Sequence, residues 1–195
     1  MKINKCMILV STGLFTLGAS AMNVQVKFLK SNNVTTEKTT YSKTELKSRE
    51  YEVSVSRQAS ETNSYKVVVG TVVSSASAKG LFLIMDTAEC VDFSKNGKKD
   101  KYTVETCSVI ATKDNARGSY GIDLNSGYQI DGIIVEVQAL DGTVVKRKTT
   151  SDTKYKKLQL SNKENWVQNA ISDTPFEKKT RITWIDPNAK KTLNR

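Results

Sequence analysis

Short apolar and β-branched runs, separated by polar and turn-forming residues, recur along most of the chain and limit what it can fold into. Residues 22–29 and 50–57 alternate apolar and polar side chains, which is typical of strands with one buried face. Residues 65–73 (YKVVVGTVV) and 80–85 (GLFLIM) are denser apolar runs of strand length rather than helix length. Seven to nine short strands are expected along the chain. The pattern predicts an all-β fold, an antiparallel β-sandwich with a β-barrel as the alternative.

The amino terminus has the pattern of a secretory signal peptide. Lys2 and Lys5 precede an apolar run over residues 6–17, and Ala19-Ser20-Ala21 offers small residues at a cleavage site. We therefore expect cleavage near Ala21 and export of the remaining chain to the periplasm or the extracellular space. No later stretch is apolar enough to span a membrane, so we expect a protein that is not membrane-spanning.

The rest of the chain divides by composition. Residues 22–48 begin with a strand and continue, over residues 31–48, as a polar Thr/Lys-rich segment that we interpret as a loop. Residues 49–158 hold most of the strand patterns and are expected to form the β-sandwich core. Residues 113–129 are rich in glycine and polar side chains and favour a long loop. Residues 159–195 are interpreted as a basic carboxy-terminal extension.

A short helix and a last strand are expected in this extension. Ser161 and Glu164 have the spacing of a capping box, which predicts a helix over residues 162–171. Residues 180–185 have a strand-like composition between two prolines.

Cys90 and Cys107 are the two cysteines that remain after cleavage, and an oxidising compartment favours their oxidation. A hairpin in which Phe93 faces Val104 would place Cys90 opposite Cys107, at a distance that a disulfide tolerates. We therefore predict a cross-strand disulfide between them.

Asp141-Gly142 lies between two β-rich runs, residues 130–140 and 143–150. Asp-Gly in this setting predicts a hairpin with a type I′ turn. Pairing about this turn sets Glu136 opposite Arg147, a favourable cross-strand charge pair.

Basic residues gather near the carboxyl end of the chain. Residues 146–195 contain 13 basic and 5 acidic side chains, whereas residues 22–145 contain 15 of each. This asymmetry favours an acidic partner such as an anionic glycan, lipopolysaccharide, nucleic acid or a membrane surface. An envelope protein is a further expected partner. Lysines can also simply solvate an exported protein or protect an edge strand from aggregation. The candidate anion-binding residues are Lys146, Arg147, Lys148, Lys154, Lys156 and Lys157.

The alternation of side chains between the two faces of a strand limits how these basic residues can act together. On a strand, Lys146 and Lys148 would lie on one face and Arg147 on the other, so a single patch does not follow from the sequence. Export argues against nucleic acid as the natural ligand.

The chain contains no histidine, which argues against several chemistries. Ser-His-Asp and Cys-His catalysis and His-ligated metals all require that residue. No phosphate-binding glycine motif occurs, and no carboxylate pair stands out. We therefore expect a protein that is not an enzyme and assign it no catalytic residue, cofactor or metal site.

Residues 127–150 (GYQIDGIIVEVQALDGTVVKRKTT) combine a Gly-Tyr loop, a long apolar strand, an Asp-Gly turn and a basic final strand. With the upstream strands, over residues 49–158, this pattern resembles the secreted immunoglobulin-like or fibronectin-type-III-like β-sandwich proteins of bacterial envelopes. The resemblance implies a binding or structural module. Antibody domains use a disulfide between sheets, whereas the Cys90–Cys107 spacing suits a single hairpin, which is a departure from that family.

Overall fold

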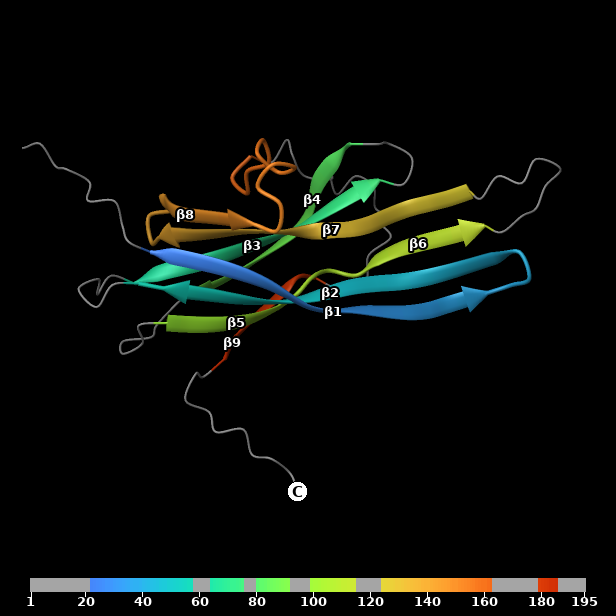
Figure 1. Ribbon diagram of the computed structural model, residues 1–195, viewed down its shortest axis with the longest axis horizontal. Helices are drawn as coiled ribbons and strands as arrows, with labels where there is room; N and C mark the ends of the chain where they lie inside the picture. The colour runs from blue at the N-terminus through green and yellow to red at the C-terminus, as the bar shows by residue number, and fades with distance from the viewer. Residues whose placement is uncertain are drawn as a thin grey trace, which may run out of the picture.

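The computed structural model describes residues 22–57, 64–75, 80–91, 99–114, 124–162 and 179–185, which form nine strands (Figure 1). All the strand pairs are antiparallel. The strands are β1 (Asn23–Lys38), β2 (Ser42–Ser56), β3 (Tyr65–Ser75), β4 (Phe82–Val91), β5 (Lys99–Glu105), β6 (Val109–Asp114), β7 (Leu124–Ala139), β8 (Val144–Thr149) and β9 (Arg181–Ile185). The described residues contain no helix, so the predicted all-β fold is confirmed.

The strands form one curled sheet with two layers. β1, β2, β5 and β9 make up one layer in that order, and β8, β7, β3 and β4 make up the other. β6 pairs with both β2 and β7 and joins the layers at one end. At the two open sides, Cα atoms of β1 and β8, and of β4 and β9, come within 8 Å of one another. The architecture thus has the character of both a sandwich and a half-barrel.

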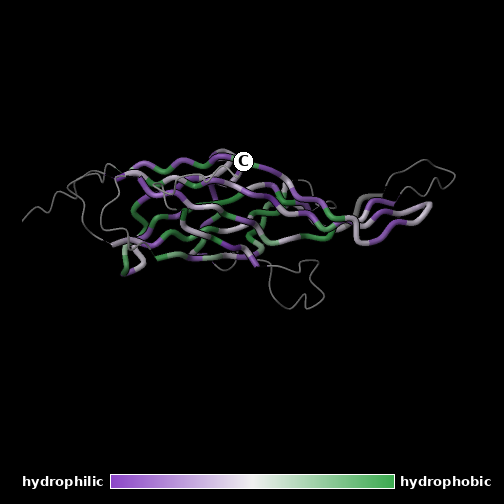
Figure 2. The backbone as a smooth tube through the Cα atoms, turned by 90° about the horizontal axis from the view of Figure 1, so that it is seen from below, coloured by the Kyte–Doolittle hydropathy of each residue, from purple (hydrophilic) through white to green (hydrophobic). Residues whose placement is uncertain are grey.

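Apolar side chains fill the space between the layers. Figure 2 shows hydrophobic and hydrophilic residues alternating along the backbone of the strands. Val53 and Val55 of β2 face Val67 and Val69 of β3 across this main core, and all four are fully buried. Burying one such valine contributes about 1.5 kcal/mol or more, which explains why alternate positions of these strands are apolar. The rest of the main core is formed by Met22, Val24, Tyr51, Tyr65, Tyr102, Val104, Ile133, Val135 and Val137.

β3 is buried on both faces, in agreement with its dense β-branched sequence. Val67 and Val69 belong to the main core, whereas Val72 belongs to a second cluster on the outer side of its layer. Tyr155 and Leu160 cover this second cluster. We call residues 151–162 the strap, because this segment of turns crosses the outer face of β3 and β7.

The prediction of a loop over residues 31–48 is wrong. β1 runs on to Lys38 and β2 starts at Ser42, so these residues form most of a hairpin that projects as an arm (Figure 1). Thr39 closes the turn, because its hydroxyl oxygen accepts the N–H of Ser42 at 2.9 Å. Both faces of this hairpin are largely polar, so it lacks the alternation that marks a strand with one buried face. Threonine-rich strands form here through backbone pairing and β propensity.

The prediction of a hairpin and disulfide around Cys90 and Cys107 is also wrong. Both residues are thiols. Cys90 lies on β4, which pairs with β3, whereas Cys107 follows β5, which pairs with β2 and β9. The two consecutive strands therefore belong to opposite layers, and the thiols pack into different apolar clusters.

The hairpin of β7 and β8 is confirmed, including the pairing of Glu136 with Arg147. The turn differs from the predicted type I′. Only Gly142 has positive φ, at 91°, and its N–H donates to the Ala139 carbonyl at 2.9 Å. A type I turn followed by a left-handed glycine gives this geometry. The register shift between Val137 and Gln138 lies farther along the hairpin, where Val145 is the extra residue on β8.

Other expectations have mixed outcomes. The strand expected over residues 180–185 is confirmed as β9. Part of the loop expected over residues 113–129 is strand instead, because β6 runs to Asp114 and β7 begins at Leu124. Residues 115–123 lie outside the described residues. The signal peptide over residues 1–21 lies outside the described residues, as does the helix over residues 162–171 except for its first residue. Across the described ranges, no helix is long and apolar enough to cross a membrane.

Candidate functional site

A groove runs along the open side of the sandwich where β1 and β8 lie next to each other. Each of these strands is the edge of its layer, since β1 pairs with β2 and β8 pairs with β7. The groove has a volume of about 710 Å³. Its lining residues, which define the seam groove, are Asn23, Val24, Gln25, Val26, Lys27, Lys146, Arg147, Lys148 and Asp152.

The register of β8 directs two lysines toward this groove. Lys146 pairs with Val137 and Lys148 with Val135, two residues whose side chains lie in the main core. Because paired residues share a face of the sheet, both lysines lie on the inner face of β8. The position of β8 at the edge of its layer lets their ammonium groups reach water while their stems cover apolar surface. Val24 and Val26 of β1 supply that apolar surface.

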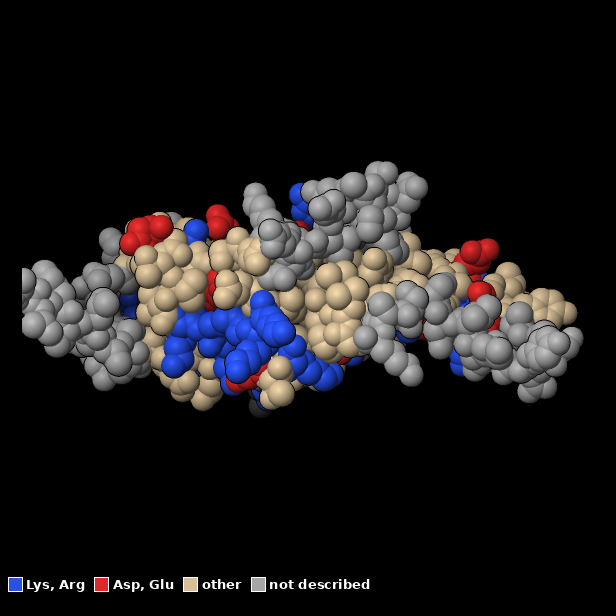
Figure 3. All heavy atoms as spheres, turned by 90° about the horizontal axis from the view of Figure 1, so that it is seen from above, with Lys and Arg blue, Asp and Glu red and all other residues tan. Residues whose placement is uncertain are grey.

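The groove is positively charged overall. Lys27 joins Lys146 and Lys148 from the β1 side, and Figure 3 shows basic side chains gathered on this face of the molecule. Asp152 is the acidic lining residue. Its carboxylate lies 2.8 Å from Lys148 Nζ and accepts a 2.8 Å hydrogen bond from Thr149. These two contacts, the lysine first, hold the pKa of Asp152 below its usual 3.8.

Arg147 lies on the opposite face of β8, as the strand alternation predicts, and it holds the strap. Its guanidinium donates to the carbonyl oxygens of Tyr155 and Leu158, at 2.9 and 2.6 Å. Glu136, its partner across the hairpin, is buried and accepts hydrogen bonds from Gln138 and from the Leu160 N–H. The Arg147–Glu136 pair therefore organises the strap, and Arg147 is a positioning residue at the border of the groove.

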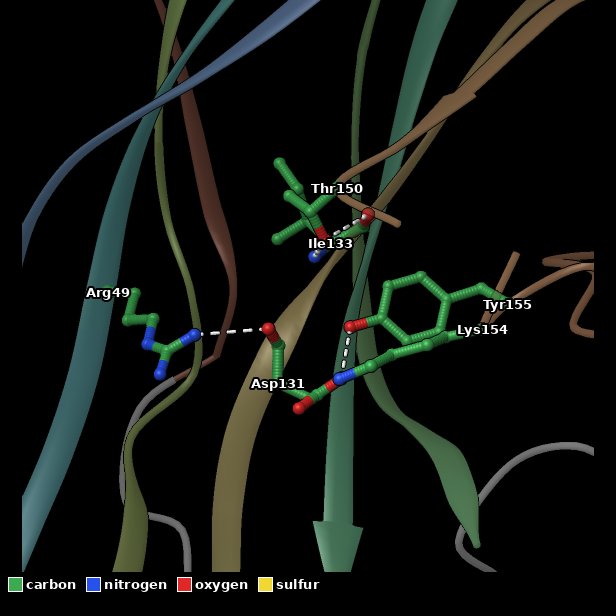
Figure 4. Close-up of polar contacts among 6 residues, drawn as sticks. All are labelled: Arg49, Asp131, Ile133, Thr150, Lys154 and Tyr155. Atoms are coloured by element: carbon green, nitrogen blue, oxygen red, sulfur yellow. Dashed lines mark hydrogen bonds and ion pairs between the residues drawn. The ribbon is translucent and has the colours of Figure 1, made fainter. Parts of the chain in front are cut away.

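A second polar cluster fixes the beginning of the strap to both layers (Figure 4). The Tyr155 hydroxyl donates to Asp131 Oδ2 at 2.5 Å, and Arg49 of β2 donates to the Asp131 carbonyl at 3.0 Å. Burial first, and then the Asp131 carboxylate, raise the pKa of Tyr155, so its hydroxyl remains a donor. The strap approaches β7 closely at Gly132, where a Cβ would meet Thr150 and, at 2.9 Å, the Tyr155 hydroxyl.

The remaining sequence-predicted lysines lie on the strap. Lys154 is 3.6 Å from Asp131 and 5.6 Å from the centre of the Phe82 ring, so it contributes to strap packing. Lys156 and Lys157 are exposed and do not line the groove. Of the six predicted basic residues, the structure thus brings Lys146, Arg147 and Lys148 to the groove, with Arg147 engaged by the strap.

Sequence reasoning missed the β1 side of the groove. Asn23, Gln25 and Lys27 were recognised as the polar positions of an amino-terminal strand, but not as neighbours of β8. More than a hundred residues separate the two edges in the chain. The sequence indicates a strand in each segment, but it does not indicate which strands form edges or which edges meet.

Two other chemistries concern the acidic and cysteine side chains of the described residues. No group of three or more Cys, Asp or Glu side chains within these ranges could hold a metal ion. Cys107 is fully buried, and burial raises the pKa of its thiol to about 12, which makes it a poor nucleophile. The arrangement can bind anions through lysine and amide groups.

Comparisons with known proteins give little further information. No protein-family model matches the chain, and no curated protein matches it. Among solved structures, a crystal structure from Akkermansia muciniphila is similar with 12% sequence identity and a TM-score of 0.34. That match covers 85% of this chain and 96% of the other.

Proposed function

We propose that this protein is an exported, non-enzymatic binding module of the immunoglobulin-like β-sandwich type. It holds an anionic component of the cell envelope or extracellular space, an anionic glycan or lipopolysaccharide, in the seam groove. The observation that carries this proposal is that lysines of two separate edge strands, Lys27 of β1 and Lys146 and Lys148 of β8, line one groove.

The physical argument concerns where these charges lie. Lys146 and Lys148 project over the apolar side chains of Val24 and Val26, so an anion bound there is partly shielded from water. Partial desolvation strengthens a charge pair relative to one in bulk water. Asp152 offsets part of this potential through its contact with Lys148, but the groove has more basic than acidic lining residues.

Export and the lack of catalysis are supported by the sequence. Residues 1–21 have the features of a signal peptide, which suits a periplasmic or extracellular binding protein. The chain has no histidine for general acid–base catalysis near neutral pH.

The test is retention of the protein on immobilised anionic polymers, heparin and lipopolysaccharide, as salt is raised. From about 0.01 M to about 1 M salt the Debye length falls from about 30 Å to about 3 Å, so retention should collapse. The double variant K146Q/K148Q should lose about tenfold in affinity, since each exposed charge contact contributes up to about 1 kcal/mol.

The matched control is K156Q/K157Q, which removes the same charge from the same region of the chain but outside the groove. It should bind as the unaltered protein does. Equal loss in both double variants would show that net charge alone drives retention, and no loss in either would refute the proposal.

A second function, assembly through protein–protein contacts, is favoured by one observation. Val34 and Tyr41 near the tip of the arm are apolar or aromatic and 58% and 68% exposed. Apolar side chains presented on a projecting hairpin suit a contact with another protein. This function predicts oligomers or a co-purifying partner in sedimentation, lost in Y41S, and a monomer at all concentrations that captures nothing would contradict it.

A further inference from the structure

An exposed aromatic ring extends the line of the seam groove. Val24, Val26 and Phe28 occupy alternate positions of β1 and therefore lie on one face of that strand. Val24 is buried, but Phe28 is 51% exposed and directly follows Lys27, the last β1 residue of the groove. Its ring packs edge-on against Tyr51, with centroids 5.7 Å apart and planes at 71°. This contact holds the ring in place while half of its surface faces water.

The groove does not admit an inserted peptide strand. Cα atoms of β1 and β8 come within 8 Å of one another, whereas a strand paired to both edges needs a gap of roughly 9–10 Å, twice the normal spacing. A ligand must therefore lie over the side chains of the groove and not in the backbone ladder. This geometry disfavours an acidic peptide that would be held by strand addition to both edges.

The groove is elongated and chemically mixed. It follows five residues of β1, a length of roughly 16 Å, so it suits an extended polymer more than a small ion. Asn23 and Gln25 add amide donors and acceptors beside the lysines. Amides match hydroxyl groups, and lysines match carboxylates or sulfates. The electron-rich face of Phe28 attracts the C–H face of a sugar ring.

We propose that the ligand of the seam groove is a linear acidic polysaccharide, with its charged groups at Lys146 and Lys148 and one sugar ring packed on Phe28. This inference rests on the proposed function and specifies the class of anion. A uronate or sulfated sugar is the shared chemistry, and the probes below separate the two sources.

The experiment measures binding of the full chain to four polymers by calorimetry: polygalacturonate, heparin, polyglutamate and neutral dextran. Polygalacturonate or heparin should bind more tightly than polyglutamate of similar charge and length, and dextran should bind weakest. F28L retains apolar volume against Tyr51 but removes the aromatic face. It should weaken polysaccharide binding about three- to tenfold, which corresponds to the usual contribution of an aromatic contact, and leave polyglutamate binding unchanged.

The matched control is W184L, which replaces an exposed aromatic on β9, at another edge of the sheet. It should not change binding to any polymer. Circular dichroism and urea unfolding of F28L establish that the variant retains its fold. If folded F28L lost binding to polyglutamate as well as to the acidic polysaccharides, the proposed aromatic contact with a sugar would also be contradicted.

The outcomes separate this inference from the proposed function. Two outcomes would overturn the polysaccharide inference and leave the anion-binding groove in place. In the first, K146Q/K148Q loses binding of every polyanion while F28L binds polysaccharide normally. In the second, polyglutamate binds as tightly as the acidic polysaccharides. If K146Q/K148Q binds all polymers normally, the proposed function falls as well.

Discussion

Asp152 shows how one side chain sets the charge of the seam groove. Its carboxylate engages Lys148 at 2.8 Å and thereby competes with any ligand anion for that lysine. D152N should raise affinity for acidic polymers about two- to threefold, because it removes a negative charge and leaves Lys148 available. The asparagine oxygen can still accept the Thr149 hydrogen bond. Calorimetry with heparin measures the change, and a lower affinity in D152N would contradict this account.

The same residue makes stability depend on acid pH. The pKa of Asp152 is held below 3.8, so its contribution to stability is present above about that pH and is lost as pH falls through the lowered value. In D152N this part of the acid dependence should be absent from urea unfolding curves.

Cys107 gives a residue-scale test of the fold. Burial raises the pKa of its thiol to about 12, so the folded state favours the protonated form. Its contribution to stability is complete below about pH 9 and is lost as pH rises toward 12. The double variant C6S/C90S retains Cys107. At pH 8, iodoacetamide should alkylate Cys107 very slowly in the native protein and rapidly in the urea-unfolded protein, as measured by mass spectrometry. Rapid labelling of the native protein, or a disulfide in the C6S protein, would contradict the structure.

Strand alternation allowed part of the site to be predicted. It separates Lys146 and Lys148 from Arg147, and the structure confirms that they lie on opposite faces of β8. The role of Arg147 was not predictable, because it depends on carbonyl groups of the strap that no periodicity places. Lys27 was not predicted as a residue of the groove for a similar reason, since nothing in a local sequence pattern relates it to β8.

The strap is the element whose stability depends most clearly on named contacts. R147M retains an apolar stem but removes the two hydrogen bonds to strap carbonyls, so it should lower the free energy of unfolding by about 2 kcal/mol. K146M changes the neighbouring, exposed position of the same strand and should change stability by no more than about 0.5 kcal/mol. Urea unfolding of both variants measures the difference. Equal stability of the two would show that Arg147 does not hold the strap.

The arm and the strap show where hydrophobic patterns fail. The hairpin over residues 31–48 has polar faces, and its strands are held by backbone pairing, a Thr39 turn and cross-strand contacts such as the Thr36 hydroxyl donating to the Thr44 carbonyl. The strap has three buried apolar residues in an irregular segment, which neither a period of two nor of 3.6 reveals. Each element also depends on a partner distant in sequence, since β2 in the arm pairs with β6 and the strap packs on β3 and β7.

At the scale of the whole molecule, the sequence predicted strand content but not strand order. Consecutive β7 and β8 form the expected hairpin because the Asp141-Gly142 turn specifies it locally. Consecutive β4 and β5 instead lie in opposite layers, and for this reason the prediction of a Cys90–Cys107 disulfide is wrong. A hairpin register between these two strands would satisfy both the cysteines and the apolar residues. In the structure, however, β4 pairs with β3 and β5 pairs with β2.

The central claim is that ligand binds along the edges of β1 and β8, and hydrogen–deuterium exchange with and without heparin tests it most directly. Edge strands exchange readily, so a ligand lying over them should slow exchange in peptides covering residues 22–28 and 144–152. Peptides from the arm and from β9 should be unchanged. Protection confined to the arm or to β9, or no protection at saturating heparin, would contradict a binding site in the seam groove.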